Sequence, residues 1–135
     1  GEHGSRIDGL LAELKDNLPT EEMAFIAQEN VVGAPTIDGV YVLFFEGVYV
    51  GSANVLLDGE ELLFGALLDS GEEIRGHATL QGNYYIVVPE SGGMEYRNRI
   101  VSIQGVASPQ APGIVECVGD EGRTRYSCMA YQLAS

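Results

Sequence analysis

Residues 72–81 read EEIRGHATLQ, and this stretch shows most clearly the pattern that decides the fold. From Glu73 onward, polar side chains occupy the odd positions and apolar or small side chains occupy the even positions. An alternation with a period of two is typical of a β-strand that has one face in water and the other buried. The stretch therefore predicts a half-buried strand, with His77 on its solvated face.

Similar short apolar segments continue on both sides of this stretch, from about residue 37 to the C-terminus, separated by turns rich in Gly, Asp and Pro. The spacing leaves no room for helices between them, which favours an antiparallel meander. We predict a mainly β fold: an eight-stranded antiparallel up-and-down β-barrel preceded by one or two N-terminal α-helices. A barrel of this size either fills its interior with side chains or holds one small ligand. The predicted strands are 38–46, 48–57, 60–68, 72–81, 83–89, 96–106, 112–119 and 123–133.

The first 30 residues follow a different, helical period. One helical face consists of Ile7, Leu10, Leu11, Leu14 and Leu18. We expect Ser5 to cap the start of this helix and Pro19 to stop it, after which Thr20 caps a second, shorter helix. The apolar side of the second helix is expected to be Met23, Ile26 and Ala27. Helices this short need a docking partner, which is either the barrel or a second copy of the chain.

The sequence divides into three parts. We interpret residues 1–5 as an expression-vector remnant or trimmed end, 6–30 as an N-terminal helical segment and 37–135 as the β-barrel domain. Residues 40–45 and 84–88 are apolar at every position, so both faces of these strands need cover. The helices or a homodimer interface could supply that cover.

The charge balance restricts the partners. The chain of 135 residues carries 20 acidic and 7 basic residues, a formal net charge of -13 at pH 7. Such an acidic protein repels phosphate backbones and anionic lipid surfaces, so we expect no nucleic acid and no membrane partner. No apolar run reaches membrane-spanning length, and we expect a cytoplasmic protein.

The chain contains no motif that identifies a reaction. It lacks the nucleophile-elbow, Ser-x-x-Lys and phosphate-loop patterns, and its histidines and cysteines do not have the spacing of a metal site. We therefore expect no metal and no cofactor, and we leave the catalytic residues unassigned. Cys117 and Cys128 lie opposite each other if the last turn centres on residues 122–123, and they form either a cross-strand disulfide or two buried thiols.

Aromatic residues are the best candidates for a binding site. Setting each strand by its polar positions predicts the following interior residues: Tyr41, Leu43, Phe45, Tyr49, Ala53, Val55, Leu62, Phe64, Leu80 and Tyr126. Tyrosines in an apolar cavity offer broad surfaces and a few hydroxyl groups, which is typical of a small-molecule pocket. We expect the ligand-binding residues to be Tyr41, Phe45, Tyr49, Phe64 and Tyr126. The alternative is that these side chains simply fill the barrel.

The plan of a helical segment followed by an eight-stranded meander resembles the lipocalin-like (calycin-like) barrels, although the chain has no tryptophan and so lacks the Gly-x-Trp of true lipocalins. Residues 46–57 (EGVYVGSANVLL) resemble the early strand-turn-strand of the spirotetronate-cyclase-like Diels–Alderases. Residues 38–41 (DGVY) resemble the opening strand of the negative regulators of type III secretion. The Gly-Gly-Asp of those regulators is replaced here by residues 64–66 (FGA).

These resemblances imply two classes of function. The first is a barrel that binds an apolar small molecule, in its finer form a cofactor-free cyclase of the [4+2] cycloaddition type in natural-product biosynthesis. Such a ring closure needs a substrate held in a reactive conformation, and it needs no nucleophile. The alternative is a non-enzymatic regulatory or protein-binding β-barrel.

Overall fold

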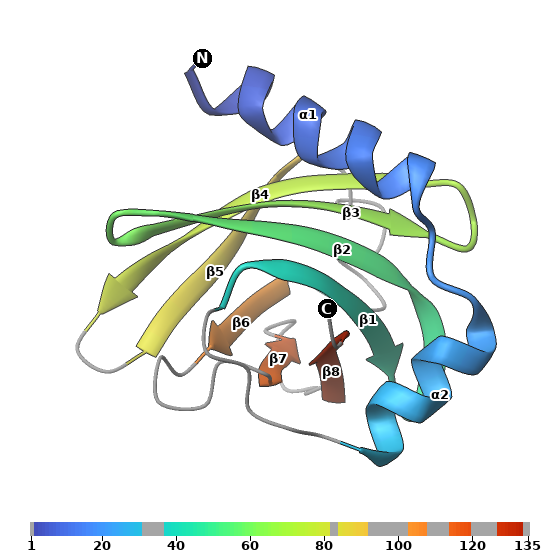
Figure 1. Ribbon diagram of the computed structural model, residues 1–135. Coiled ribbons are helices and arrows are strands. Elements are labelled where there is room, and N and C mark those ends of the chain that lie inside the picture. The colour runs from blue at the N-terminus through green and yellow to red at the C-terminus, as the bar shows by residue number, and fades with distance from the viewer. Residues whose placement is uncertain are drawn as a thin grey trace.

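The structure is a computed structural model. It describes the backbone of residues 2–30, 37–81, 84–91, 103–107, 114–119 and 127–133, and the side chains of residues 4–30, 37–79 and 129–133. Two helices come first, and eight strands follow (Figure 1). The elements are α1 (Glu2–Asp16), α2 (Glu21–Glu29), β1 (Gly39–Phe45), β2 (Val48–Asp58), β3 (Glu61–Leu68), β4 (Glu73–Gln81), β5 (Tyr84–Ser91), β6 (Ile103–Ala107), β7 (Ile114–Gly119) and β8 (Ser127–Gln132).

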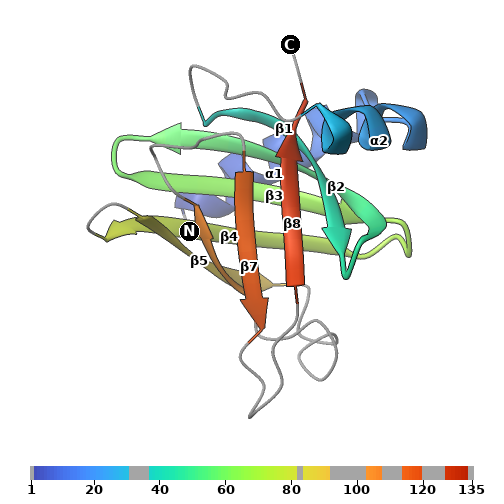
Figure 2. The same ribbon diagram turned by 90° about the horizontal axis from the view of Figure 1, so that it is seen from below.

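The strands pair antiparallel in the order of the chain, each with the next. In addition, β8 pairs with β1, from Tyr41 opposite Gln132 to Phe45 opposite Cys128. Figure 2 shows the end of β1 running alongside β8. The prediction of a mainly β protein whose helices precede its strands is confirmed, and β1 to β4 each begin and end within one residue of the predicted segments.

The predicted alternation in β4 is also confirmed. Ile74, Gly76 and Ala78 are buried, whereas Glu73, Arg75 and His77 between them are only partly buried. The first set belongs to the face that we call the inner face, which lies away from α1, and the second set belongs to the outer face, which α1 crosses (Figure 1).

The helix α1 packs on the outer face of β2 and β3 through an apolar stripe. Ile7, Leu10 and Leu11 contact Leu63, which is 0% exposed, and Leu56 packs against the same cluster. Burial of such a stripe supplies most of the stability of a helix in a protein. The predicted docking of the first helix on the sheet is therefore what the structure shows.

The close approach of α1 depends on a glycine. A Cβ atom on Gly65 would lie 2.6 Å from Cγ of Leu11 and 3.3 Å from the carbonyl oxygen of Ile7. Next to it, the amide of Asn54 donates hydrogen bonds to the carbonyl oxygen of Leu10 (3.1 Å) and to Oε2 of Glu13 (3.2 Å). These contacts fix the helix over the centre of β3.

Ion pairs surround this apolar contact. Arg6 pairs with Asp58 at 2.5 Å, and Lys15 pairs with Glu73 at 3.2 Å. Arg75 binds Asp8 at 2.9 Å. All of these side chains are substantially exposed, so each pair is worth about 0–1 kcal/mol at most. They orient α1, while the leucines and Ile7 hold it.

The helix ends differ in part from the sequence prediction. Thr20 caps α2 as predicted, because its Oγ1 accepts a hydrogen bond from the backbone nitrogen of Met23 at 3.2 Å. The prediction that Ser5 caps the first helix is wrong, since α1 already begins at Glu2.

The predicted apolar side of α2 is largely wrong. The buried residues of the helix are Ala24 and Ala27, which pack against Val42 and Phe44 of β1. Small side chains let the short helix lie close to the bulky ring of Phe44 and its aromatic neighbours. As a result, Met23 and Ile26 point outward, at 44% and 52% exposure.

Candidate functional site

The inner face of the sheet carries two adjoining apolar clusters. The first contains Ile37, Tyr41, Leu62, Ala78 and Ala130. The second contains Ala53, Ala66, Leu68 and Ile74. Leu43 and Phe64 pack against both clusters, so they lie where the two meet.

Small residues are frequent on this face. Ala53 of β2 and Ala66 of β3 are cross-strand partners, and Ala78 of β4 and Ala130 of β8 lie in the other cluster. Gly76 of β4 is the partner of Phe64 on β3. These side chains occupy less volume than Leu or Ile would at the same positions, so the described inner face combines large and small residues around Phe64.

The exposure of neighbouring side chains differs between the two faces of β3. Phe64 lies in the middle of β3, flanked by strands on both sides, yet it is only partly buried. Its neighbour Leu63 faces the opposite way, under α1, and is 0% exposed. Leu43 and Val55 on the inner face are likewise partly buried. Thus α1 covers Leu63 completely on the outer face of β3, whereas Phe64 on the inner face keeps some solvent-accessible surface.

Tyr41 lines the inner face as a neutral side chain. It is 1% exposed, and its hydroxyl donates a hydrogen bond to the carbonyl oxygen of Ile37 at 2.6 Å. Burial, with a smaller contribution from the negative charge of Asp38, raises the pKa of Tyr41 well above its ordinary value. The ring is therefore available for apolar contact, while the hydroxyl is hydrogen-bonded to the backbone of the same segment.

That segment is fastened to the strands on either side of β1. The carboxylate of Asp38 accepts a hydrogen bond from the backbone nitrogen of Leu57 on β2. The side-chain amide of Gln132 on β8 donates to the carbonyl oxygen of Asp38 at 2.6 Å. Ile37 is 5% exposed and belongs to the inner-face cluster. The start of β1 therefore covers the inner face at this end of the strands.

Of the predicted ligand-binding residues, Tyr41 and Phe64 lie on the inner face. Phe45 follows Tyr41 and Leu43 in the alternation of β1 and is half-buried at the strand's end. Tyr126 and the side chain of Leu80 lie outside the described residues. Whether any of these residues binds a ligand stays a prediction.

The interior placement of Tyr49 is wrong. The register between β1 and β2 shifts between Leu43 and Phe44, so that Leu43 faces Gly51 while Phe44 faces Tyr49. Val50 is the extra residue of this bulge, and it reverses the direction of the side chains that precede it. Tyr49 therefore lies on the outer face, where its ring centroid is 5.7 Å from that of Phe44. Its pKa is raised by burial and by the negative charges of Asp69 and Glu21.

The two cysteines meet in the predicted register. Cys117 of β7 and Cys128 of β8 are directly paired across the ladder. Their side chains are outside the described part of the chain, so the choice between a disulfide and two thiols stays a prediction.

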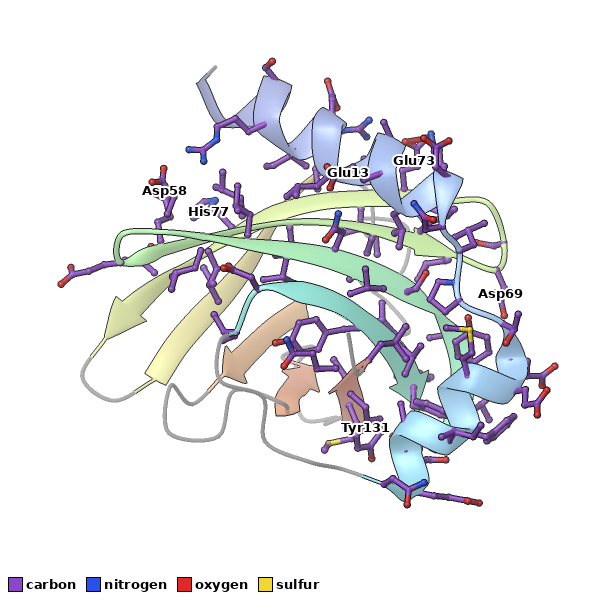
Figure 3. All side chains as sticks on the ribbon, in the orientation of Figure 1. Glu13, Asp58, Asp69, Glu73, His77 and Tyr131 are labelled. Atoms are coloured by element: carbon purple, nitrogen blue, oxygen red, sulfur yellow. The ribbon has the colours of Figure 1, made fainter. Side chains whose placement is uncertain are left out.

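His77 lies on the α1 side of the sheet, as does Glu73, whose carboxylate pairs with Lys15 of α1 (Figure 3). Its partner across the ladder is Leu63, which is an outer-face residue. Within the side chains that the structure describes, no group of three or more His, Cys, Asp or Glu residues is arranged to hold a metal ion. Among the described helices, none has the length and apolar character needed to cross a membrane.

Sequence reasoning missed the part that small residues play. It selected large aromatic residues as markers of a cavity, whereas Ala66, Gly76, Ala78 and Ala130 also lie on the inner face. The signal was present in the alternation, because Gly76 and Ala78 occupy the buried positions of residues 72–81.

No family model matches the chain, and the searches of curated proteins and of solved structures also give no significant match.

Proposed function

We propose that the eight strands form a closed lipocalin-like barrel whose interior binds one apolar small molecule. The pairing of β8 with β1, together with the chain-order pairing of the other strands, supports the closed barrel. The segment of Ile37 and Asp38 covers the inner face at the start of β1, which supports a ligand entrance at the opposite end of the strands.

One observation carries the proposal: Phe64 retains solvent-accessible surface on the inner face of a central strand. A filled barrel would bury this ring completely, as α1 buries Leu63 on the other side of the same strand. The cross-strand partner of Phe64 on β4 is Gly76, which has no side chain to cover the ring. A pocket of this kind is lined mainly by apolar side chains.

The polar groups of the described inner face restrict the class of ligand. The hydroxyl of Tyr41 donates to Ile37, and the amide of Gln132 donates to Asp38. Because these donors are already used, recognition would depend on shape and apolar contact. The proposed ligand is therefore a hydrocarbon-rich molecule without a net charge.

In its finer form the proposal is a cofactor-free cyclase of the [4+2] type. An apolar interior that holds a flexible polyene in a folded conformation would lower the entropic part of the barrier to ring closure. The test is conversion of a linear polyene that carries a diene and a dienophile. The rate should exceed that of the uncatalysed reaction, and Phe64→Ala should reduce it.

Binding itself is tested by native mass spectrometry of the protein after incubation with a lipid extract of the cells that express it. The unmodified protein should retain one small-molecule adduct per chain. The Phe64→Ala variant should lose the adduct, because the ring that the ligand contacts is removed. Leu56→Ala is the matched control, since Leu56 is a partly buried residue of the outer face.

Two results would contradict the proposal. One is the absence of any adduct from the unmodified protein, and the other is equal retention by Phe64→Ala and Leu56→Ala. Thermal unfolding of both variants shows whether a lost adduct reflects a lost fold.

A further inference from the structure

Five large apolar side chains of the described residues are exposed, and four of them lie on α2 or just before it. The five are Leu18 (50% exposed), Met23 (44%), Phe25 (41%), Ile26 (52%) and Val48 (63%). Val48 begins β2 opposite Phe45, on the face of the sheet away from Tyr49, so it is not part of the surface around α2. The ring of Phe25 packs on Phe44 of β1, with ring centroids 5.8 Å apart.

Acidic residues share this surface. Glu22 and Glu29 are exposed and lie four residues before Ile26 and three residues after it, which places all three side chains on one side of the helix. Glu21 and Asp69 are close enough to Tyr49 to raise its pKa together with burial. Figure 3 shows Asp69 beside the start of α2.

The described cations are engaged elsewhere. Arg6, Lys15 and Arg75 pair with Asp58, Glu73 and Asp8, at the contact between α1 and the sheet. No ion pair involves the carboxylates of α2 in the described part of the chain. The surface around α2 therefore combines exposed apolar side chains with negative charge that is not neutralised by a described Lys or Arg.

Charge decides which partner fits this surface. A second copy of the chain would bring the glutamates of both α2 helices together, between two molecules with a net charge of -13 each. A partner segment with apolar and basic side chains on one face would instead bury Met23 and Ile26 while pairing with Glu22 and Glu29.

We propose that the outer surface of α2 is a docking site for a basic amphipathic helical segment of another protein. Ile26 is its central apolar contact, and Glu22 and Glu29 are its charged contacts. The site is on the outside of the sheet, separate from the inner face, so this proposal does not depend on the ligand-binding proposal.

The probe is a fluorescein-labelled peptide of about 14 residues, close to four helical turns, with Leu on one face and Lys on the other. Fluorescence anisotropy at about 0.15 M salt measures its Kd for the full chain. The controls are a peptide of the same composition whose order destroys the two faces, and a peptide with Glu in place of Lys. The ordered basic peptide should bind at least about tenfold more tightly than either control, a difference of about 1.4 kcal/mol.

Single variants locate the binding site. Ile26→Ser and Glu22→Gln should each weaken binding of the ordered peptide, with Ile26→Ser weakening it about tenfold. Glu60→Gln removes the same charge as Glu22→Gln from an exposed residue of the β2–β3 turn, so it should leave the Kd unchanged. Because Ile26 is largely exposed, its replacement should not alter the thermal unfolding temperature.

Three outcomes would overturn the proposal. The first is equal binding of the ordered and disordered basic peptides, which would show general attraction to an acidic protein. The second is equal weakening by Glu22→Gln and Glu60→Gln, or no weakening by Ile26→Ser. The third is a dimer in sedimentation velocity that Ile26→Ser converts to a monomer, since a second copy would then be the occupant.

Discussion

Tyr41 shows most clearly how burial changes the acidity of a side chain. Its hydroxyl is removed from water and donates to the carbonyl oxygen of Ile37, and the charge of Asp38 lies nearby. Both burial and that charge disfavour the phenolate, so the folded protein binds the phenolic proton more tightly than the unfolded chain does.

This difference predicts a loss of stability at alkaline pH. Below a pKa of about 10, the hydroxyl is protonated in both states. Above it, the unfolded chain releases the proton while folded Tyr41 retains it, so the free energy of unfolding falls as the pH rises. Urea unfolding between pH 9 and 11 should show a steeper fall for the unmodified protein than for Tyr41→Phe. Equal slopes would contradict the assignment.

The same variant also measures, at neutral pH, what the hydrogen bond of Tyr41 contributes to stability. Tyr41→Phe removes the hydrogen bond to Ile37 and leaves its carbonyl oxygen without this donor, which should cost about 1–3 kcal/mol. Urea unfolding at pH 7 measures this cost. Any alkaline decline that remains in the variant includes the contribution of Tyr49, whose pKa is also raised.

At the scale of elements, the contact between α1 and β3 shows which interaction holds a helix on a sheet. The helix is surrounded by ion pairs, but its buried side chains are Ile7, Leu10, Leu11 and Leu14. Exposed ion pairs contribute little, whereas buried leucines contribute several kcal/mol.

Two substitutions at this contact should therefore differ in size. Leu11→Ala should reduce the free energy of unfolding by about 2–5 kcal/mol. Arg75→Gln, which removes the pairs with Asp8 and Glu73, should reduce it by less than about 1 kcal/mol. Chemical denaturation of both variants measures the difference, and an equal loss would show that charge rather than packing holds α1.

Two substitutions of glycine by alanine should have opposite effects on stability. Gly65→Ala should destabilise the protein by about 1–3 kcal/mol, because the new Cβ would meet Leu11. Gly9→Ala should stabilise it by about 0.5–1 kcal/mol, since a Cβ at this helical position meets no atom within 4 Å. Thermal unfolding distinguishes the two, and a stable Gly65→Ala variant would contradict the close approach of α1.

The elements also show which side-chain orientations the sequence patterns can predict and which they cannot. The alternation within residues 72–81 predicted correctly which residues of β4 are buried, because each residue there advances by one position along a regular ladder. The face expected to be solvated is partly covered by α1. The same reasoning failed at Tyr49, because the extra residue Val50 reverses the alternation and a bulge leaves no clear mark in a run of apolar residues. It failed again at α2, where the helical period could not show that Ala24 and Ala27 would be buried in preference to Met23 and Ile26.

At the scale of the whole molecule, the two faces of the sheet have different surroundings. The outer face is covered by α1 over β2 and β3 and by α2 over β1 and β8. The inner face has apolar side chains of mixed size, and its central residue Phe64 remains partly accessible. The sequence predicted a barrel with aromatic residues inside, but it could not show whether they fill the interior.

The most direct test of the proposed interior site uses the absence of tryptophan from the chain. Phe64→Trp places a single fluorophore on the inner face, and Leu56→Trp places one on the outer face under α1. A brominated long-chain alcohol quenches tryptophan only on contact. We expect saturable quenching at one site per chain in Phe64→Trp and none in Leu56→Trp. Absence of quenching in Phe64→Trp, or equal quenching in both variants, would contradict an interior that binds apolar molecules.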